Sequence, residues 1–221
     1  MSHLVRNERW GVVDLDPDSG RVFVREDWRY EWKAKPWLPE WSPAERRAYH
    51  HALDRLVWAR WSNRATLRAN LQEGIDASSP AGALAVELSM KTLSLTFDVR
   101  WVPSRAHWTV TVNRADPAAE QKPRANVDSD LMTIDLYDID VVAQHASRPE
   151  GAPHRRGHFY ISAHEFGHTL FNRDEYWMKS PHFRDIASIM NIGQGLRPRH
   201  FKLVVDTLHK MVPGCTFTAS L

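Results

Sequence analysis

One five-residue segment constrains the fold of this chain more than any other part of the sequence. It reads His164-Glu165-Phe166-Gly167-His168. Two histidines four positions apart lie on one face of a helix, one turn apart. Apolar residues at helical spacing surround the segment, which predicts a helix across residues 160–171. A fold for this chain must therefore direct both imidazole rings from one helix face toward a common point.

This pair of rings has the spacing of a zinc site. Two imidazole nitrogens one turn apart can bind the same ion at about 2.0–2.1 Å each. Zinc lowers the pKa of bound water toward about 7, and Glu165 is placed to take the proton as that water attacks a carbonyl carbon. The sequence therefore predicts one catalytic Zn²⁺ held by His164 and His168, with Glu165 as general base. The competing interpretation is a pair of helix histidines whose polar atoms are satisfied within the core.

The residues that follow extend the motif. The stretch His164 to Asp174 resembles the metzincin zinc metallopeptidases, whose pattern is H-E-x-x-H-x-x-G-x-x-H, with Asp last in some families. The resemblance implies that Asp174 is the third ligand. Ser188-Ile189-Met190-Asn191 looks like a Met-turn, which implies that Met190 forms an apolar floor beneath the metal.

The sequence departs from the metzincin pattern at one position. Phe171 stands where the pattern has glycine, which normally ends the helix in a left-handed conformation. Asn172 tolerates that conformation better, so we expect the helix to end one residue late. This leaves Glu175 open as an alternative third ligand, because it is the only glutamate after His168. His182 and Asp185 are more remote candidates.

A second likeness covers about the last sixty residues. His-Glu-Phe-Gly-His is followed in order by Asp174-Glu175-Tyr176, Asp185, Ser188-Ile189-Met190-Asn191 and Arg197-Pro198-Arg199-His200-Phe201. This order is similar to the metallopeptidase toxin domains of bacterial type VI and related contractile secretion systems. The resemblance implies an antibacterial effector made in the bacterial cytoplasm, carried by a secretion machine into a target cell and neutralised by an immunity protein.

Four further side chains are candidates for binding substrate. Tyr176, Arg197, Arg199 and His200 follow the ligands in the sequence and are able to stabilise a tetrahedral oxyanion or hold a substrate carboxylate. Structural hydrogen bonding is an equally good interpretation of each. A strand at residues 107–113 is a further hypothesis, as a cleft edge that binds an extended peptide by strand addition.

The predicted function is thus that of a hydrolase, a zinc metallopeptidase acting on a protein or peptide. One alternative keeps the zinc and makes the chain an amidase or peptidase acting on peptidoglycan. Another is a catalytically inactive zincin-fold binding module. The intact Glu165 argues against the inactive module, because a protein without catalysis has no need of the general base.

Composition excludes several other classes of function. The net charge of +2 comes without a basic stripe interleaved with aromatics, which argues against nucleic-acid binding. Cys215 is the only cysteine, so neither an intramolecular disulfide nor a thiolate metal cluster is possible. Residues 1–10 lack the apolar core of a signal peptide, and no run of about 18 apolar residues suggests a membrane span.

The pattern of the whole chain predicts the α+β class. We expect a zincin-like metallopeptidase with a mixed twisted sheet, the active-site helix, a long helix in the N-terminal half and a C-terminal helix. Residues 1–221 are predicted to form a single domain. Its parts are 1–41 (a hairpin and a Trp-rich extension), 42–145 (the long helix and the sheet) and 146–221 (the active-site helix, the Met-turn-like segment and the C-terminal helix).

Local signals place the elements. Apolar runs at 12–15 and 21–24 flank an Asp, Pro and Gly turn, which predicts a hairpin. Ser42-Pro43-Ala44-Glu45 predicts a helix start with a capping box. Strands are expected at 93–102 and 107–113, paired as a hairpin, and at 131–142. A terminal helix is expected at 199–211, and the tryptophans of the 28–41 segment are expected to form an irregular lid over the core.

Overall fold

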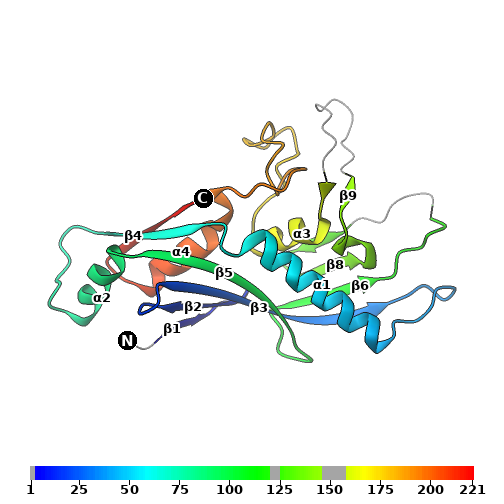
Figure 1. Cartoon of the computed structure of the whole chain (residues 1–221), viewed down its shortest axis with the longest axis horizontal. Helices are drawn as coiled ribbons and strands as arrows, with labels where there is room; N and C mark the ends of the chain where they lie inside the picture. The colour runs from blue at the N-terminus through cyan, green and yellow to red at the C-terminus, as the bar shows by residue number, and fades with distance from the viewer. Residues whose placement is uncertain (1–2, 120–124, 146–157) are drawn as a thin grey trace. The chain divides into compact units, whose positions relative to one another are not determined.

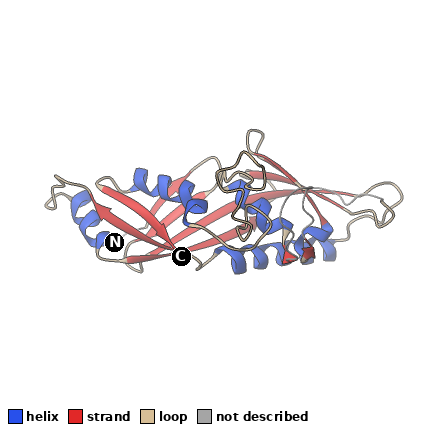
Figure 2. Cartoon of the chain, turned by 90° about the horizontal axis from the view of Figure 1, so that it is seen from above, coloured by secondary structure: helices blue, strands red, loops and turns tan. Residues whose placement is uncertain are grey.

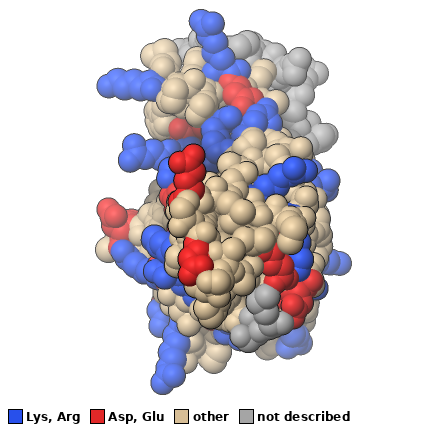
Figure 3. Space-filling view, turned by 90° about the vertical axis from the view of Figure 1, so that its left-hand side faces the viewer, with Lys and Arg blue, Asp and Glu red and all other residues tan. Residues whose placement is uncertain are grey.

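A computed structural model describes residues 3–119, 125–145 and 158–221. This part of the chain is an α+β protein with a mixed sheet and four α-helices (Figure 1, Figure 2). The predicted class is therefore confirmed, together with the long helix, the helix that contains His164 and His168, and the C-terminal helix. None of the described helices has the length and apolar character needed to cross a bilayer. On the face drawn in Figure 3, basic and acidic side chains are interspersed among uncharged ones.

The chain divides into two compact units by its internal contacts. The first unit comprises residues 1–26, 61–98 and 196–221, and the second comprises residues 27–60 and 99–195. One boundary falls within strand β3 (Arg21–Lys33) and another within strand β5 (Thr92–Trp101). The expectation of a single metallopeptidase domain stays a prediction.

The first unit is built on antiparallel strands. Its strands follow the order β11-β4-β5-β3, and β2 and β1 continue from β3. Helix α2 packs against β4, and helix α4 packs against β11. The remaining elements of this unit are β1 (Leu4–Asn7), β2 (Val12–Asp16), β4 (Thr66–Leu71), α2 (Pro80–Ser89), η2 (Pro198–Phe201), α4 (Lys202–Met211) and β11 (Cys215–Ser220).

Two predictions fall in this unit. The first hairpin is confirmed, because β2 and β3 pair antiparallel from Val12↔Arg25 to Asp16↔Arg21. The terminal helix is also present, although its first turn is the 3₁₀ segment η2 and strand β11 follows it. Helix α2 was not predicted. Its start signal was present in the sequence, since Ser79 caps the Gly82 backbone N–H at 3.1 Å and proline occupies the first turn.

The second unit contains the parallel part of the sheet. Strand β6 lies between β3 and β8 and is parallel to both, while β7 pairs antiparallel with β8. The 3₁₀ segment η1 follows β8 directly. The elements of this unit are α1 (Pro43–Trp61), β6 (Trp108–Asn113), β7 (Asn126–Asp128), β8 (Thr133–Tyr137), η1 (Asp138–Val141), β9 (Gln144–His145), β10 (His158–Phe159) and α3 (Ile161–Thr169).

The long helix begins as predicted. Ser42 and Glu45 form the capping box, in which the Glu45 backbone N–H donates to Ser42 Oγ at 3.3 Å and the Ser42 backbone N–H donates to Glu45 Oε2 at 2.8 Å. The helix buries Tyr49, Leu53 and Val57 along one face. Burial of that stripe positions α1 in the unit.

Strand β3 overturns two predictions for this unit. Trp28 and Trp32 belong to this 13-residue strand rather than to an irregular lid, and Trp28 is fully buried. Strand β3 also lies between β5 and β6, so the predicted hairpin of residues 93–102 and 107–113 is wrong. Because β6 is paired on both sides, residues 107–113 offer no free edge for strand addition. Alternation specifies the face of a strand and not its partner.

One further prediction needs correction here, and another lies beyond the described residues. The strand expected at 131–142 is shorter, because Asp138–Val141 turn into η1. Asp140 is fully buried, and its carboxylate accepts the Tyr137 backbone N–H at 2.7 Å. The loop expected at 146–158 lies almost wholly outside the described residues.

Candidate metal centre

Helix α3 is buried on nearly every side. Its side chains are apolar or small around the two histidines, and it packs against η1 and β7. The hydroxyl of the buried Ser162 donates to the Asp140 carbonyl oxygen at 2.7 Å, which fixes the first turn of α3 to η1. This packing holds His164, with 3% of its surface exposed, and Glu165, with 8%, in a region largely shielded from water.

The C-terminus of α3 has a left-handed residue at the position of the metzincin glycine. Phe171 has φ 57°, its N–H donates to the His168 carbonyl at 2.9 Å, and the Asn172 N–H donates to the Gly167 carbonyl at 3.2 Å. These two bonds form a Schellman motif. The expectation that the helix ends one residue late at Asn172 is therefore wrong. Phenylalanine accepts the glycine conformation at a cost of about 1–2 kcal/mol.

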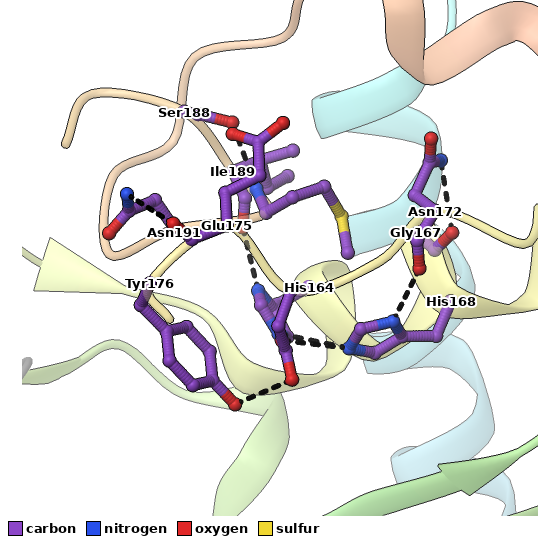
Figure 4. A network of polar contacts seen from close by, with 11 residues as sticks. His164, Gly167, His168, Asn172, Glu175, Tyr176, Ser188, Ile189 and Asn191 are labelled. Carbon is purple, nitrogen blue, oxygen red and sulfur yellow. Dashed lines mark hydrogen bonds and ion pairs between the residues drawn. The ribbon is translucent and has the colours of Figure 1, made fainter. Parts of the chain in front are cut away.

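Three side-chain atoms converge at the end of this helix. His164 Nε2 lies 3.0 Å from Asp174 Oδ1, His168 Nε2 lies 3.2 Å from the same oxygen, and the two Nε2 atoms are 3.2 Å apart. Figure 4 shows the two imidazole rings turned toward each other. Within the described residues, these three side chains form a group that can hold a metal ion.

The hydrogen bond of the other nitrogen of each ring determines the tautomer of that histidine. His164 Nδ1 lies 2.7 Å from the Ile189 carbonyl oxygen, and His168 Nδ1 lies 2.7 Å from the Asn172 carbonyl oxygen. A carbonyl oxygen only accepts, so both Nδ1 atoms carry the proton. In the neutral rings both Nε2 atoms then present lone pairs to each other and to a carboxylate. Three converging acceptors require a cation between them, either a proton or a metal ion.

The dimensions of this triangle suit zinc. Tetrahedral zinc with bonds of 2.0–2.1 Å separates its ligand atoms by about 3.3 Å. The three observed separations of 3.0–3.2 Å are close to that value. A zinc ion would be held by His164, His168 and Asp174, and three protein ligands are the number found in catalytic zinc sites that keep a fourth position open. The backbone carbonyls that hold each Nδ1–H are the outer-shell partners typical of histidine ligands.

Burial and charge shift the pKa values of this group in different directions. Burial raises the pKa of Glu165 above its ordinary value, although the nearby His164 and His168 oppose the shift. Burial alone would raise the pKa of Asp174, but its hydrogen bonds with His164 and His168 outweigh this and lower it strongly. Burial disfavours charge on His168, yet the hydrogen bond with Asp174 and the charge of Glu165 prevail and raise its pKa.

These shifts predict how metal binding depends on pH. A metal ion must displace the proton of His168, whereas Asp174 is already ionised. We expect zinc affinity to fall about tenfold per pH unit as the pH decreases below the raised pKa of His168. Competition with a chelator of known pH dependence, measured between pH 8 and pH 5.5, checks this. An affinity that stays constant over this range would contradict proton competition at the site.

The segment predicted as a Met-turn lies next to His164 in space. Met190 is fully buried, and its carbonyl oxygen accepts the Glu175 N–H at 2.8 Å. The carbonyl of the preceding residue, Ile189, holds the His164 ring. The Asn191 side-chain amide donates to the Glu175 carbonyl at 3.4 Å. This turn therefore fixes both the first histidine and the backbone next to Asp174, and the role of Met190 as a floor beneath a metal stays a prediction.

The structure separates the candidates for third ligand. Asp174 belongs to the converging group, whereas Glu175 does not. The Glu175 side chain is buried and extends away from the two imidazole rings in Figure 4. The more remote candidates, His182 and Asp185, also lie outside the group. Geometry thus favours Asp174.

Tyr176 contacts Asp174, the third residue of this group. Its hydroxyl donates to Asp174 Oδ2 at 2.8 Å, and its ring stacks on His164 with centroids 6.1 Å apart. Oδ1 of the carboxylate then faces the two histidines while Oδ2 is held by the tyrosine. This contact gives Tyr176 a positioning role in the structure, and its predicted role toward substrate stays a prediction.

Replacing Tyr176 with Phe removes this hydrogen bond and keeps the ring. Loss of an outer-shell partner typically weakens metal binding by about 10–100-fold, so we expect zinc affinity to fall by about tenfold or more. Chelator competition measures the effect. Tyr160→Phe is the matched control, because the Tyr160 ring contacts Arg60 and its hydroxyl takes no part in the hydrogen bonds between the two histidines and Asp174. Equal affinities for the two variants would exclude the positioning role.

The other three candidates for substrate binding belong to the first compact unit. Arg197 precedes η2, and Arg199 and His200 lie within it. His200 is buried, and its Nδ1 accepts the Arg197 backbone N–H at 3.1 Å. This is the structural hydrogen bonding that the sequence left as an alternative for His200. The predicted contacts of Arg197, Arg199 and His200 with substrate stay predictions.

Sequence reasoning missed the backbone partners of the two rings. The carbonyls of Ile189 and Asn172 fix the histidine tautomers, and any residue type supplies a carbonyl. Comparison with protein-family models, with curated proteins and with solved structures finds no match to this chain. The chemistry of this centre must therefore be argued from its own residues.

Proposed function

We propose that this chain is a zinc-dependent metallopeptidase in which Glu165 is the general base. One observation carries the proposal. Nε2 of His164, Nε2 of His168 and Oδ1 of Asp174 converge within 3.0–3.2 Å, while both Nδ1 atoms are bonded to backbone carbonyls. The donor set of two imidazoles and one carboxylate is that of catalytic zinc sites with an open fourth position.

Each residue of the centre has a separate task. A zinc ion at this site supplies Lewis acidity, which acidifies water and polarises a carbonyl. Glu165 follows the first ligand on α3 and accepts the proton of the attacking water. Its burial raises its pKa, which makes it a stronger base than an exposed glutamate. Tyr176 keeps Asp174 oriented toward the histidines.

The biological setting rests on the likeness to effector domains alone. On that basis we propose a secreted antibacterial toxin that is made in the bacterial cytoplasm, delivered by a type VI or related machine and bound by an immunity protein. A protein or peptide is the proposed substrate. Peptidoglycan is the alternative substrate, and an inactive zincin-fold binding module is the alternative without catalysis.

One experiment separates these possibilities. The purified chain is analysed for metal and incubated with a casein-type substrate and, in parallel, with purified sacculi, before and after metal removal and zinc restoration. We expect one zinc ion per chain and casein cleavage that is lost with the metal and regained with zinc. Release of muropeptides without casein cleavage would show that the substrate is peptidoglycan and would overturn the proposal that it is a protein or peptide. Absence of stoichiometric zinc would overturn the metal centre and favour the binding module.

A further inference from the structure

A pocket adjoins the metal centre in the second compact unit. Its volume is about 550 Å³, within the range of ligand-binding pockets. His168 and Asp174 line it, so it borders two of the three residues of the metal-binding group. The aromatic side chains of Phe171 and Trp177 also line it. A molecule that reacts at the centre therefore meets these two rings.

Phe171 occupies its position at an energetic disadvantage. Its φ of 57° suits glycine, and a bulky residue in this region is a marked outlier. Its side chain is 43% exposed, so burial in the core does not explain why an aromatic residue stands there. Backbone strain of this kind concentrates at binding and catalytic sites. The side chain that bears the strain is one that lines the pocket.

Trp177 is a second exposed aromatic in the same pocket. It is 63% exposed, an unusual state for so large an apolar side chain. Arg173, which also lines the pocket, is exposed and has no ion-pair partner among the described residues. The pocket thus offers two aromatic surfaces and one cation, next to the polar side chains of Ser129 and Asn172. The apolar surface is the larger contribution, since each aromatic ring can cover much of a substrate side chain.

We propose that this pocket is a substrate subsite for a large apolar side chain, preferably aromatic, next to the scissile bond. The proposal rests on the peptidase function proposed above. Phe171 and Trp177 are the specificity-determining residues, and the strained backbone at Phe171 directs one aromatic wall to the metal centre. The substrate class is thereby narrowed to peptides with a bulky apolar residue beside the cleaved bond.

The test compares three variants with the wild type. Phe171→Gly and Trp177→Ala each remove one aromatic wall, and Phe171→Gly also relieves the left-handed strain, so it retains the fold. Met178→Ala is the matched control, because Met178 adjoins Trp177 and is 86% exposed but does not line the pocket. Zinc content and melting temperature are measured for each variant. Zinc content is expected to stay at the wild-type value, and the melting temperature is expected to stay at the wild-type value or, in Phe171→Gly, to rise above it.

Cleavage profiles give the first readout. A peptide library is digested with the zinc-loaded chain, and the residues flanking each cut are identified by mass spectrometry. We expect one flanking position to favour Phe and other large apolar residues over Ala at least tenfold. Phe171→Gly and Trp177→Ala should each reduce that preference at least about threefold, and Met178→Ala should keep it. Cleavage without this preference, or with a preference for an acidic substrate residue that Arg173 would bind, would overturn the subsite and leave the proposed peptidase function intact.

Binding gives a second readout that does not need turnover. Peptides differing only in Phe or Ala are titrated by calorimetry into the zinc-loaded Glu165→Gln variant, alone and combined with Phe171→Gly. Tighter binding of the Phe peptide, lost when Phe171 is replaced, would support the subsite. If the wild type cleaves no peptide, that result overturns the peptidase function but not the subsite. Equal binding of the two peptides would overturn the subsite.

Discussion

Replacing Glu165 with Gln is expected to reduce hydrolysis of a casein-type substrate by about 10²–10⁴-fold, the usual contribution of a positioned general base. The amide has the shape of the carboxylate but does not accept the proton of the attacking water. His164, His168 and Asp174 form the metal-binding group without Glu165, so zinc content should be unchanged. Activity and metal content measured on the same preparation check the prediction.

The control for this variant is a carboxylate far from the chemistry but in the same compact unit. Glu31→Gln serves, because the Glu31 side chain is 45% exposed and contacts Arg29. It should keep both activity and zinc. Full activity in Glu165→Gln would disprove the assignment of the base. Loss of zinc in that variant would instead give the buried Glu165 a structural role in the centre.

The proximity of the two histidines was predictable because it depends on local geometry. A spacing of four residues on a helix brings His164 and His168 together whatever the rest of the fold does, and helix α3 bears this out. The capping box at Ser42 was predictable for the same reason. Both patterns are set within one or two turns of backbone.

The arrangement of the sheet was not predictable from the same signals. Alternation identified β5 and β6 as strands, but strand β3 separates them, because partner choice depends on long-range packing. The helix end at Phe171 was mispredicted for a different, local reason. Propensity favours asparagine over phenylalanine in the left-handed conformation, but the Schellman hydrogen bonds to the Gly167 and His168 carbonyls place that conformation at Phe171.

The second large effect is expected on zinc affinity, when the proposed third ligand is removed. Asp174→Ala removes the carboxylate that completes the donor set, and it leaves two imidazoles whose Nε2 atoms are 3.2 Å apart. We expect zinc affinity to fall by more than the roughly 10–100-fold typical of an outer-shell partner, with activity lost at micromolar zinc. Asp174→Asn keeps the shape and removes the charge, and it should weaken zinc binding in the same direction.

Glu175→Ala is the decisive comparison, because Glu175 is adjacent in sequence, is also an acid and is the alternative ligand. Its backbone is bonded to the Met190 carbonyl and its side chain extends away from the two rings, so zinc affinity should stay near the wild-type value. Removal of this buried side chain is expected to lower the melting temperature instead. Chelator competition and thermal unfolding of both variants separate the two effects. If Glu175→Ala lost zinc and Asp174→Ala kept it, Glu175 would be the third ligand. Asp174 would then be only a carboxylate that is hydrogen-bonded between two histidines.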